Sequence, residues 1–329
     1  MGRWVGSLRP AVYTNCLRYT GLMQPVAEAA GRLRANLETA VVLRPQVADL
    51  LAAVLFAGGH ILLVDVPGVG KTLLARTLAR SIQGTFRRVQ FTSDLLPADI
   101  TGTAMYNQKA GDFQFVPGPL FANIVLADEI NRATPRTQAA LLEAMGEGQV
   151  SADGATHCLP RPFLVVATQN PVETYGTFPL PEAELDRFLI SLSLGYPDAQ
   201  QAVRILDLQE HEEPQVRPVF HAEEVEALQR AVRSVAVAVP VKEYVVALIE
   251  STRTHPGVIL GGSPRAAVAL QRASQAWAAI RGRAFVSPDD VKAVAGPVLA
   301  HRLVLSHATR TEAAAALVDE LLHQVPVPL

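Results

Sequence analysis

The chain has 329 residues, enough for one large domain or two ordinary domains with sizeable cores. Apolar residues make up 49% of it and aromatic residues 6%, a composition that favours a helix-rich α/β protein over a β-sandwich. The formal net charge is −2, from 29 basic and 31 acidic residues, so no overall field attracts nucleic acid or anionic lipid.

The first 22 residues differ from the rest of the chain. They contain three arginines but no acidic residue, and they lack the apolar segment of a secretory signal. Pro10 is expected to interrupt any helix here. We interpret residues 1–24 as a disordered N-terminal extension, with Met23 as an alternative start; a transit-like or interaction arm is the other interpretation.

Residues 25–197 alternate between helical and strand patterns. Short apolar runs bounded by turn residues predict strands at residues 61–64, 88–91, 124–127, 163–168 and 189–194. Helical patterns, one of them with Pro45 at its first position, predict helices at residues 25–40, 45–57, 71–81, 135–147 and 181–186. Two further segments, residues 103–116 and 149–160, alternate around turns and predict β-hairpins.

The strand pattern stops after Pro197. Everything up to residue 322 is expected to form amphipathic helices, separated by breaks at residues 211–218, 256–263 and 282–288. Strands that alternate with helices predict a mainly parallel, doubly wound sheet. The predicted fold is therefore a three-layer αβα domain over residues 25–197, followed by an all-helical lid domain over residues 198–329.

The strongest chemical signal is the segment Asp-Val-Pro-Gly-Val-Gly-Lys-Thr at residues 65–72, between a predicted strand and a predicted helix. Such a loop aims backbone N–H groups and a helix N-terminus at a phosphate chain. Lys71 would reach the β- and γ-phosphates of ATP, and Thr72 would ligate Mg²⁺. Asp65 stands where the strict pattern has Gly. The candidate nucleotide contacts are Pro67, Gly68, Val69, Gly70, Lys71, Thr72 and Leu73.

Two later strands supply candidate catalytic groups. The run ending in Asp128 and Glu129 offers a carboxylate for Mg²⁺ and a carboxylate that could polarise the attacking water. Asn170 follows the next strand, where its amide could contact both the γ-phosphate and that water. Each pattern is common on its own, so both assignments depend on the phosphate-binding loop upstream.

The order and spacing of several segments resemble the MoxR family of AAA+ ATPases. The segments are Asp-Glu-Ile-Asn-Arg-Ala at 128–133, the helix at 138–145, Ala-Thr-Gln-Asn-Pro at 167–171, Leu-Pro-Glu-Ala-Glu-Leu-Asp-Arg-Phe at 180–188, Gly-Ser-Pro-Arg-Ala at 262–266, Val-Ser-Pro-Asp-Asp-Val at 286–291 and Ala-His-Arg-Leu at 300–303. The resemblance covers roughly residue 26 to the C-terminus.

This resemblance implies roles for two arginines. Arg187 corresponds to a family arginine that acts in trans on the ATP of the neighbouring subunit, with a surface or ion-paired arginine as the alternative. Arg265, just inside a helix capped by Ser263, resembles the sensor arginine of the lid. The two hairpins resemble inserts that line the central face of a ring, or they only stabilise the core. Residues 42–46 depart from the Gly-Gln that the family usually has near the adenine.

The resemblance also implies partners. It predicts an ATP hydrolase that forms a ring homo-oligomer, expected to be a hexamer, and remodels or activates a client enzyme, including by metal insertion. The helper would be a separate protein with a von Willebrand factor A-type domain. Two cysteines, Cys16 and Cys158, are too few for a disulfide framework, and the apolar run at residues 50–57 is too short to span a bilayer. We therefore expect a cytoplasmic protein without membrane insertion.

Two other classes of function stay open. One is a nucleic-acid motor of the same clade, which the near-neutral charge and the scarcity of Lys and Arg on the hairpins disfavour. The other is a scaffold that binds nucleotide without turnover, which the presence of Glu129 disfavours.

Overall fold

The computed structural model describes residues 11–65, 68–109, 111–152, 154–170, 176–210, 216–306 and 311–328, with only the backbone described at residues 11–22, 209–210 and 311–312. A central sheet of five parallel strands has the order β2-β5-β8-β1-β9. Its strands are β1 (Ile61–Val64), β2 (Phe86–Gln90), β5 (Ile124–Asp128), β8 (Leu164–Gln169) and β9 (Ile190–Leu192).

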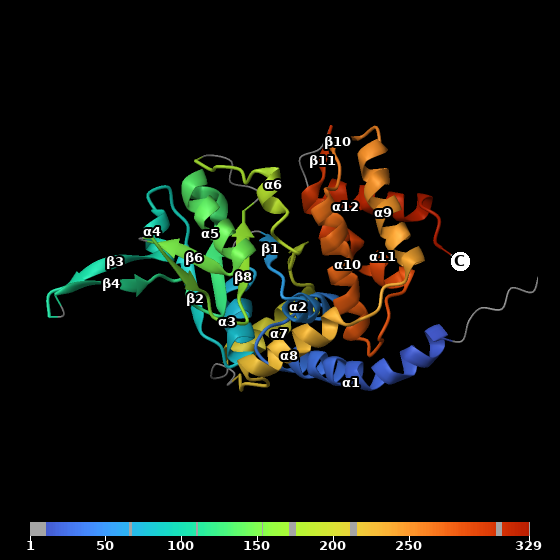
Figure 1. The fold of residues 1–329 in the computed structure, drawn as a ribbon, viewed down its shortest axis with the longest axis horizontal. Helices are drawn as coiled ribbons and strands as arrows, with labels where there is room; N and C mark the ends of the chain where they lie inside the picture. The colour runs from blue at the N-terminus through green and yellow to red at the C-terminus, as the bar shows by residue number, and fades with distance from the viewer. Residues whose placement is uncertain are drawn as a thin grey trace, which may run out of the picture.

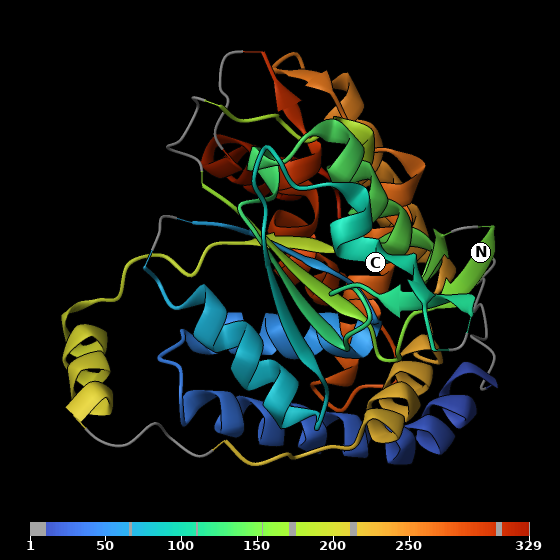
Figure 2. The same cartoon turned by 90° about the vertical axis from the view of Figure 1, so that its left-hand side faces the viewer.

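Alternating side chains of the sheet belong to two separate cores. Ile61, Leu63 and Leu126 pack with helices α1 (Ala11–Glu38), α2 (Pro45–Ala57) and α3 (Lys71–Ser81) in one cluster. Leu62 and Val125 pack with α5 (Pro135–Glu147) in the other. Because successive side chains of a strand point to opposite faces, the sheet is covered on both sides. Figure 2 shows α1 to α3 on one side and α5 on the other, which confirms the predicted αβα layers.

Two β-hairpins leave this core, as predicted. The first pairs β3 (Gly102–Asn107) with β4 (Asp112–Pro117) after the short helix α4 (Pro97–Thr101), and it projects from the body in Figure 1. The second pairs β6 (Gln149–Ala152) with β7 (Ala155–Cys158). Phe115 of the first hairpin stacks on His157 of the second, with ring centroids 3.8 Å apart.

The first helix differs from its predicted start. We expected it to begin at Pro25, but α1 already begins at Ala11 and contains Pro25. Proline interrupts a helix because it lacks an N–H and clashes with the preceding turn, yet tertiary packing can outweigh that cost. Met23, Val26, Leu33 and Leu37 are all fully buried, so the helix is held by one packed face that extends to both sides of the proline.

The C-terminal region contains helices α7 (Ala199–Glu210), α8 (Ala222–Arg233), α9 (Val239–Thr254), α10 (Pro264–Ala279), α11 (Pro288–Leu299) and α12 (Thr311–Gln324). The predicted helical lid is present, and it also contains a small antiparallel sheet of two strands, β10 (Val258–Leu260) and β11 (Val304–Leu305), which was not predicted. Both strands are too short to give a recognisable alternation. Helices α9 to α12 lie together on the right of Figure 1.

Helices α7 and α8 lie outside the group formed by α9 to α12. Helix α8 packs against α1 and α2 as well as against α10. Helix α7 stands away from the sheet at the left of Figure 2. None of the helices in the described ranges combines the length and the apolar character that crossing a bilayer requires.

Candidate nucleotide-binding site

The predicted chemical groups meet at one edge of the sheet. Strand β8 lies between β1 and β5, and all three run in the same direction. The phosphate-binding loop follows β1, Asp128 ends β5 with Glu129 directly after it, and Asn170 directly follows β8. Because parallel strands end at the same edge, the topology places the three groups side by side, where open α/β sheets bind ligands.

The loop between β1 and α3 is shaped for an anion. Gly68 and Gly70 have φ of +87° and +88°, a conformation that L side chains rarely adopt. Gly70 is the N-cap of α3 and provides no side-chain cap, so the first N–H groups of the helix are available to a phosphate. Lys71 Nζ donates to Asp65 O at 3.1 Å, and Thr72 is half-buried. Pro67 lies outside the described residues.

The side chain of Asp65 makes structural hydrogen bonds, which explains why this position of the loop is Asp rather than the Gly of the strict pattern. The residue is 4% exposed, and its carboxylate accepts hydrogen bonds from Ser193 Oγ at 2.8 Å, Leu194 N at 2.6 Å and Gly195 N at 3.1 Å. The side chain therefore points to the segment after β9 and leaves the phosphate cradle free. It ties the start of the loop to that segment.

The two acids at the end of β5 are held differently. Asp128 Oδ2 accepts from Arg88 Nη2 at 2.6 Å, and Asp128 Oδ1 accepts from Thr168 Oγ1 at 2.7 Å. Glu129 has φ of +56°, a left-handed conformation that costs a residue with a side chain roughly 1–3 kcal/mol. Its backbone N–H donates to the same Thr168 Oγ1 at 2.8 Å. One buried threonine thus fixes both acids.

The carboxylate of Glu129 has two partners of its own. Gln90 Nε2 donates to Glu129 Oε2 at 2.7 Å, and Arg132 Nη1 lies 3.1 Å from the same oxygen. Gln90 Oε1 in turn accepts from Arg88 Nη2 at 2.9 Å. A polar chain of Arg88 and Gln90, both on the edge strand β2, therefore connects the two carboxylates.

The oxygen ligands near the loop suit Mg²⁺. Mg²⁺ prefers hard oxygen ligands, retains several waters and is usually held by one or two protein groups together with substrate phosphates. Thr72 and Asp128 are such groups. Among the residues with described side chains, no set of three or more His, Cys, Asp or Glu could hold a metal alone. The donor set therefore fits a metal that arrives with a nucleotide.

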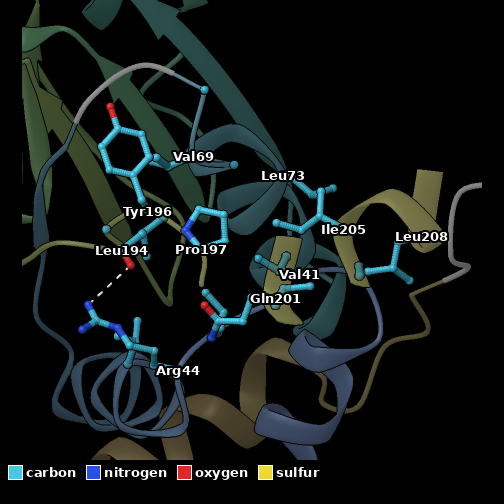
Figure 3. Close-up of a pocket in the computed structure, with 17 residues that line it drawn as sticks. Val41, Arg44, Val69, Leu73, Leu194, Tyr196, Pro197, Gln201, Ile205 and Leu208 are labelled. Atoms are coloured by element: carbon cyan, nitrogen blue, oxygen red, sulfur yellow. Dashed lines mark hydrogen bonds between the residues drawn. The ribbon is translucent and has the colours of Figure 1, made fainter. Parts of the chain in front are cut away.

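An open pocket of about 320 Å³ adjoins the loop. It is lined by Ala40, Val41, Val42, Leu43, Arg44, Val47, Gly68, Val69, Gly70, Leu73, Leu194, Gly195, Tyr196, Pro197, Gln201, Ile205 and Leu208. Figure 3 shows the apolar side chains converging from the α1–α2 connection, α3 and α7. Arg44 Nη2 donates to Ser193 O at 3.0 Å and Leu194 O at 3.4 Å, which closes one side. The segment that departs from the family pattern therefore lines this pocket.

Arg187 and Arg265, the two arginines with predicted roles at the nucleotide, lie farther along the chain. Arg187 is half-buried, and its Nη1 donates to Leu142 O of α5 at 2.8 Å. Arg265 is exposed in the first turn of α10. Ser263, the N-cap of α10, donates from Oγ to Asp186 Oδ2 at 2.7 Å. This contact connects the segment that carries Arg187 to the helix that carries Arg265.

Sequence reasoning missed four residues of the site, namely Arg44, Arg88, Gln90 and Thr168. Arg88 and Gln90 are two positions apart on β2, so a polar i, i+2 pair on a predicted strand was the available signal. Thr168 ends a predicted apolar strand, and nothing in its local pattern distinguishes it from a strand residue. Arg44 precedes the proline of α2 and carries no local signal either.

Comparisons with known proteins agree with this geometry. Residues 60–190 match the model of the ATPase family associated with various cellular activities (AAA), and residues 250–321 match an AAA lid domain. The chain is 40% identical to Chaperone MoxR1 of Mycobacterium tuberculosis, over 87% of this chain and 77% of that protein. It is 32% identical to Protein MoxR of Methylorubrum extorquens (92% and 96%) and 48% identical to the uncharacterized protein YeaC of Bacillus subtilis (91% and 95%).

A solved structure extends the agreement to the whole fold. The crystal structure of a candidate ATPase from Cytophaga hutchinsonii superposes with a TM-score of 0.82 at 34% identity, covering 97% of this chain and 98% of that one. The chain therefore belongs to the MoxR family of AAA+ ATPases.

Proposed function

We propose that this protein binds ATP with Mg²⁺ and hydrolyses it at the edge formed by β1, β8 and β5. The observation that carries the proposal is the convergence there of an uncapped helix N-terminus with Lys71, the acids Asp128 and Glu129, and Asn170. An anion cradle, a metal-binding carboxylate, a second carboxylate and an amide are the parts that phosphoryl transfer to water requires.

Each residue would have a distinct task. Gly68, Val69 and Gly70 would present backbone N–H groups to the phosphates, and Lys71 would turn from Asp65 O to the β- and γ-phosphates. Thr72 and Asp128 would hold Mg²⁺, which supplies neutralisation of the charge on the phosphate oxygens. Glu129 would orient the attacking water and accept its proton. Asn170 would position that water and the γ-phosphate.

The pocket beside the loop would take the adenine. Its walls are mostly apolar, and its one arginine, Arg44, is engaged with backbone carbonyls. A flat aromatic base fits such walls, and the backbone of Val42 and Leu43 would face its polar edge. Leu73 and Ile205 face the pocket from α3 and α7, so closure of α7 would cover the bound base (Figure 3).

Efficient turnover would require a ring, which we propose to be a hexamer. Arg187 would reach the ATP of the neighbouring subunit, and Arg265 would contact phosphate from the lid. The relative named Chaperone MoxR1 supports a chaperone-like role. In that role, hydrolysis would remodel or activate a client enzyme, including by metal insertion. We further propose a helper with a von Willebrand factor A-type domain and a cytoplasmic location.

Two substitutions test the hydrolase. Lys71→Ala should abolish binding of a fluorescent ATP analogue, whereas Glu129→Gln should keep the affinity and lower phosphate release by roughly 10²-fold or more, as expected for a general base. Lys109→Ala, on the exposed β3–β4 hairpin, is the matched control. Full affinity and turnover in Lys71→Ala would overturn the proposal. Stimulation of the ATPase by added DNA would instead favour a nucleic-acid motor.

A further inference from the structure

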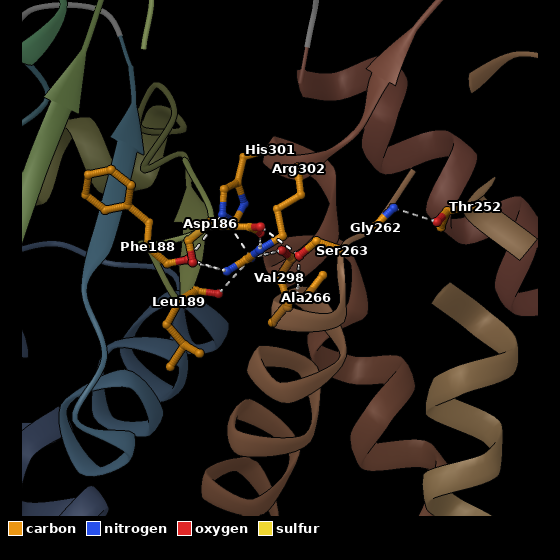
Figure 4. Close-up of polar contacts among 10 residues, drawn as sticks. All are labelled: Asp186, Phe188, Leu189, Thr252, Gly262, Ser263, Ala266, Val298, His301 and Arg302. Atoms are coloured by element: carbon orange, nitrogen blue, oxygen red, sulfur yellow. Dashed lines mark hydrogen bonds and ion pairs between the residues drawn. The ribbon is translucent and has the colours of Figure 1, made fainter. Parts of the chain in front are cut away.

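One guanidinium from the C-terminal region holds the backbone on both sides of Arg187. Arg302 lies in the 3-10 turn Ala300–Arg302, and its side chain is only 2% exposed. Its Nε donates to Asp186 Oδ1 at 2.8 Å, its Nη2 donates to Phe188 O at 2.5 Å, and its Nη1 donates to Leu189 O at 3.3 Å (Figure 4). The stretch 186–189 is therefore wrapped around a single side chain of another region.

A second contact joins the same stretch to α10. Asp186 Oδ2 accepts from Ser263 Oγ at 2.7 Å, and Ser263 Oγ, as the N-cap of the helix, in turn accepts from Ala266 N at 3.1 Å. Figure 4 shows Asp186 between Arg302 and Ser263. Arg265 lies in the first turn of the helix that Ser263 caps. The residue before Arg187 is thus bonded to the helix end that bears Arg265.

These contacts specify geometry more than they add stability. A buried ion pair is weak evidence of stability, because the cost of removing two charges from water offsets their attraction. Arg302 also directs its remaining donors to backbone carbonyls, including Val298 O in α11. Because the guanidinium is planar and its five N–H donors have fixed directions, it fixes the positions of the oxygens that accept from it. Arg302 therefore ties the 186–189 stretch to α11 in one defined arrangement.

We infer that Asp186, Ser263 and Arg302 form a relay that sets the position of Arg187 according to the position of the helical lid. The inference rests on the proposed action of Arg187 on a neighbouring subunit. ATP in a subunit's own site would draw Arg265 and α10 toward the phosphates, and the relay would carry the 186–189 stretch with them. Each subunit would then offer Arg187 to its neighbour only when its own site is filled.

Each subunit would contribute to two ATP sites, its own and the neighbouring site that receives its Arg187. Mixed rings allow the effect of a substitution on each site to be measured separately. A Glu129→Gln subunit binds ATP and keeps Arg187, and an Arg187→Ala subunit keeps its own base but has no arginine to offer. Neither should hydrolyse ATP efficiently alone, and mixing them should restore phosphate release. Arg302→Lys is then placed in one type of subunit at a time. Arg253→Lys is the matched control, because Arg253 Nε also donates to a lid carbonyl, Gly262 O at 2.8 Å.

In the Glu129→Gln subunit, Arg302→Lys should reduce the restored rate at least about tenfold, since a misplacement of about 1 Å costs on the order of 10²-fold. In the Arg187→Ala subunit, Arg302→Lys should change the restored rate much less. The control Arg253→Lys should leave the restored rate unchanged in either type of subunit. A purely structural role predicts equal losses in both arms and would overturn the relay while sparing the proposed function. Absence of restoration in the unmodified mixture would overturn the trans role of Arg187 and the relay with it.

A second variant keeps the inference testable if Arg302→Lys does not fold. If Arg302→Lys lowers the thermal unfolding midpoint below the assay temperature, Asp186→Asn replaces it, because the amide has the same size but weakens the bond to the guanidinium. The same dependence on the subunit is expected, with the affinity for a fluorescent ATP analogue preserved. An unchanged restored rate with Asp186→Asn in the Glu129→Gln subunit would contradict the inference.

Discussion

Gln90 Nε2 lies 2.7 Å from Glu129 Oε2, so an amide on the edge strand of the sheet holds the carboxylate that we propose as the base. Together with Arg132, it engages the oxygen that would have to face the attacking water. This contact retains Glu129 in a conformation directed at β2. If Glu129 acts as the proposed base, its carboxylate would have to leave Gln90 before hydrolysis.

Gln90→Ala should therefore raise the basal ATPase rate. A hydrogen bond to a charged group contributes about 1.5–3 kcal/mol, and only part of this stabilises the held conformer over the active one, so we expect an increase of up to about tenfold. Phosphate release at saturating ATP measures it. Gln149→Ala is the matched control, because Gln149 makes a similar contact with Glu147 on the surface, at 3.2 Å. A lower rate would show that Gln90 assists Glu129 in catalysis.

Asp65→Ala should weaken both the fold and nucleotide binding. It leaves Ser193 Oγ and the N–H groups of Leu194 and Gly195 without their acceptor, a loss of about 2–4 kcal/mol in the free energy of unfolding. Leu194 and Gly195 line the pocket, so the affinity for ATP should fall as well. Denaturant unfolding and titration with a fluorescent ATP analogue measure the two effects.

Asp65→Gly makes this prediction sharper. It restores the strict phosphate-binding pattern, yet we expect it to be as defective as Asp65→Ala, because the missing acceptor matters rather than the loop. Asp112→Ala, at the exposed first residue of β4 in the first hairpin, serves as the control. If Asp65→Gly bound ATP better than the parent chain, the structural role assigned to Asp65 would be wrong.

Local patterns predicted the parts of the fold that local interactions decide. The helices beginning at Pro45, Lys71 and Pro135 have their predicted bounds, because a proline or a glycine-rich loop marks each start and a turn marks each end. The same patterns failed for α1, where packing overrides Pro25.

Contacts between distant residues could not be predicted in this way. Thr168 meets Asp128 across 40 positions, and Arg302 meets Asp186 across 116. Each pairing depends on strand order or on how the lid packs. The motif residues of the site could therefore be named from the sequence, but not the side chains that hold them in place.

The protein should lose stability in acid through His60. This imidazole is 7% exposed; its Nδ1 accepts from Val165 N at 3.0 Å and its Nε2 donates to Met145 O at 3.1 Å. Burial lowers the pKa of His60 from 6.5 to about 4, and the hydrogen bond to Met145 opposes that shift. Between these values the unfolded chain binds more protons. The contribution is therefore complete above pH 6.5 and is lost as the pH falls toward 4, by about 3 kcal/mol at most.

His60→Gln isolates this contribution, because an amide can both donate and accept without titrating. We expect a lower free energy of unfolding at pH 7.5 and a shallower decline between pH 6.5 and 4.5, measured by urea unfolding. His323→Gln, on the exposed end of α12, should keep the slope of the parent chain. Burial also lowers the pKa of His301, so some slope should remain in His60→Gln. A slope equal to that of the parent would refute the assignment.

Arg88→Ala should lower the concentration of Mg²⁺ that hydrolysis requires. Arg88 Nη2 lies 2.6 Å from Asp128 Oδ2, and this charge competes with a metal for the same carboxylate. The arginine side chain is 49% exposed, so solvent screens the pair and the effect should be modest, a few-fold in the half-saturating concentration. Phosphate release at fixed ATP, titrated with Mg²⁺, measures it.

Arg87→Ala is a close control for Arg88→Ala, since the neighbouring side chain is also exposed but points to the opposite face of β2. It should leave the Mg²⁺ dependence unchanged. Nucleotide affinity in excess EDTA should be similar in both variants, because neither arginine lies in the phosphate-binding loop. If Arg88→Ala instead raised the Mg²⁺ requirement, Arg88 would be orienting Asp128 for the metal rather than competing with it.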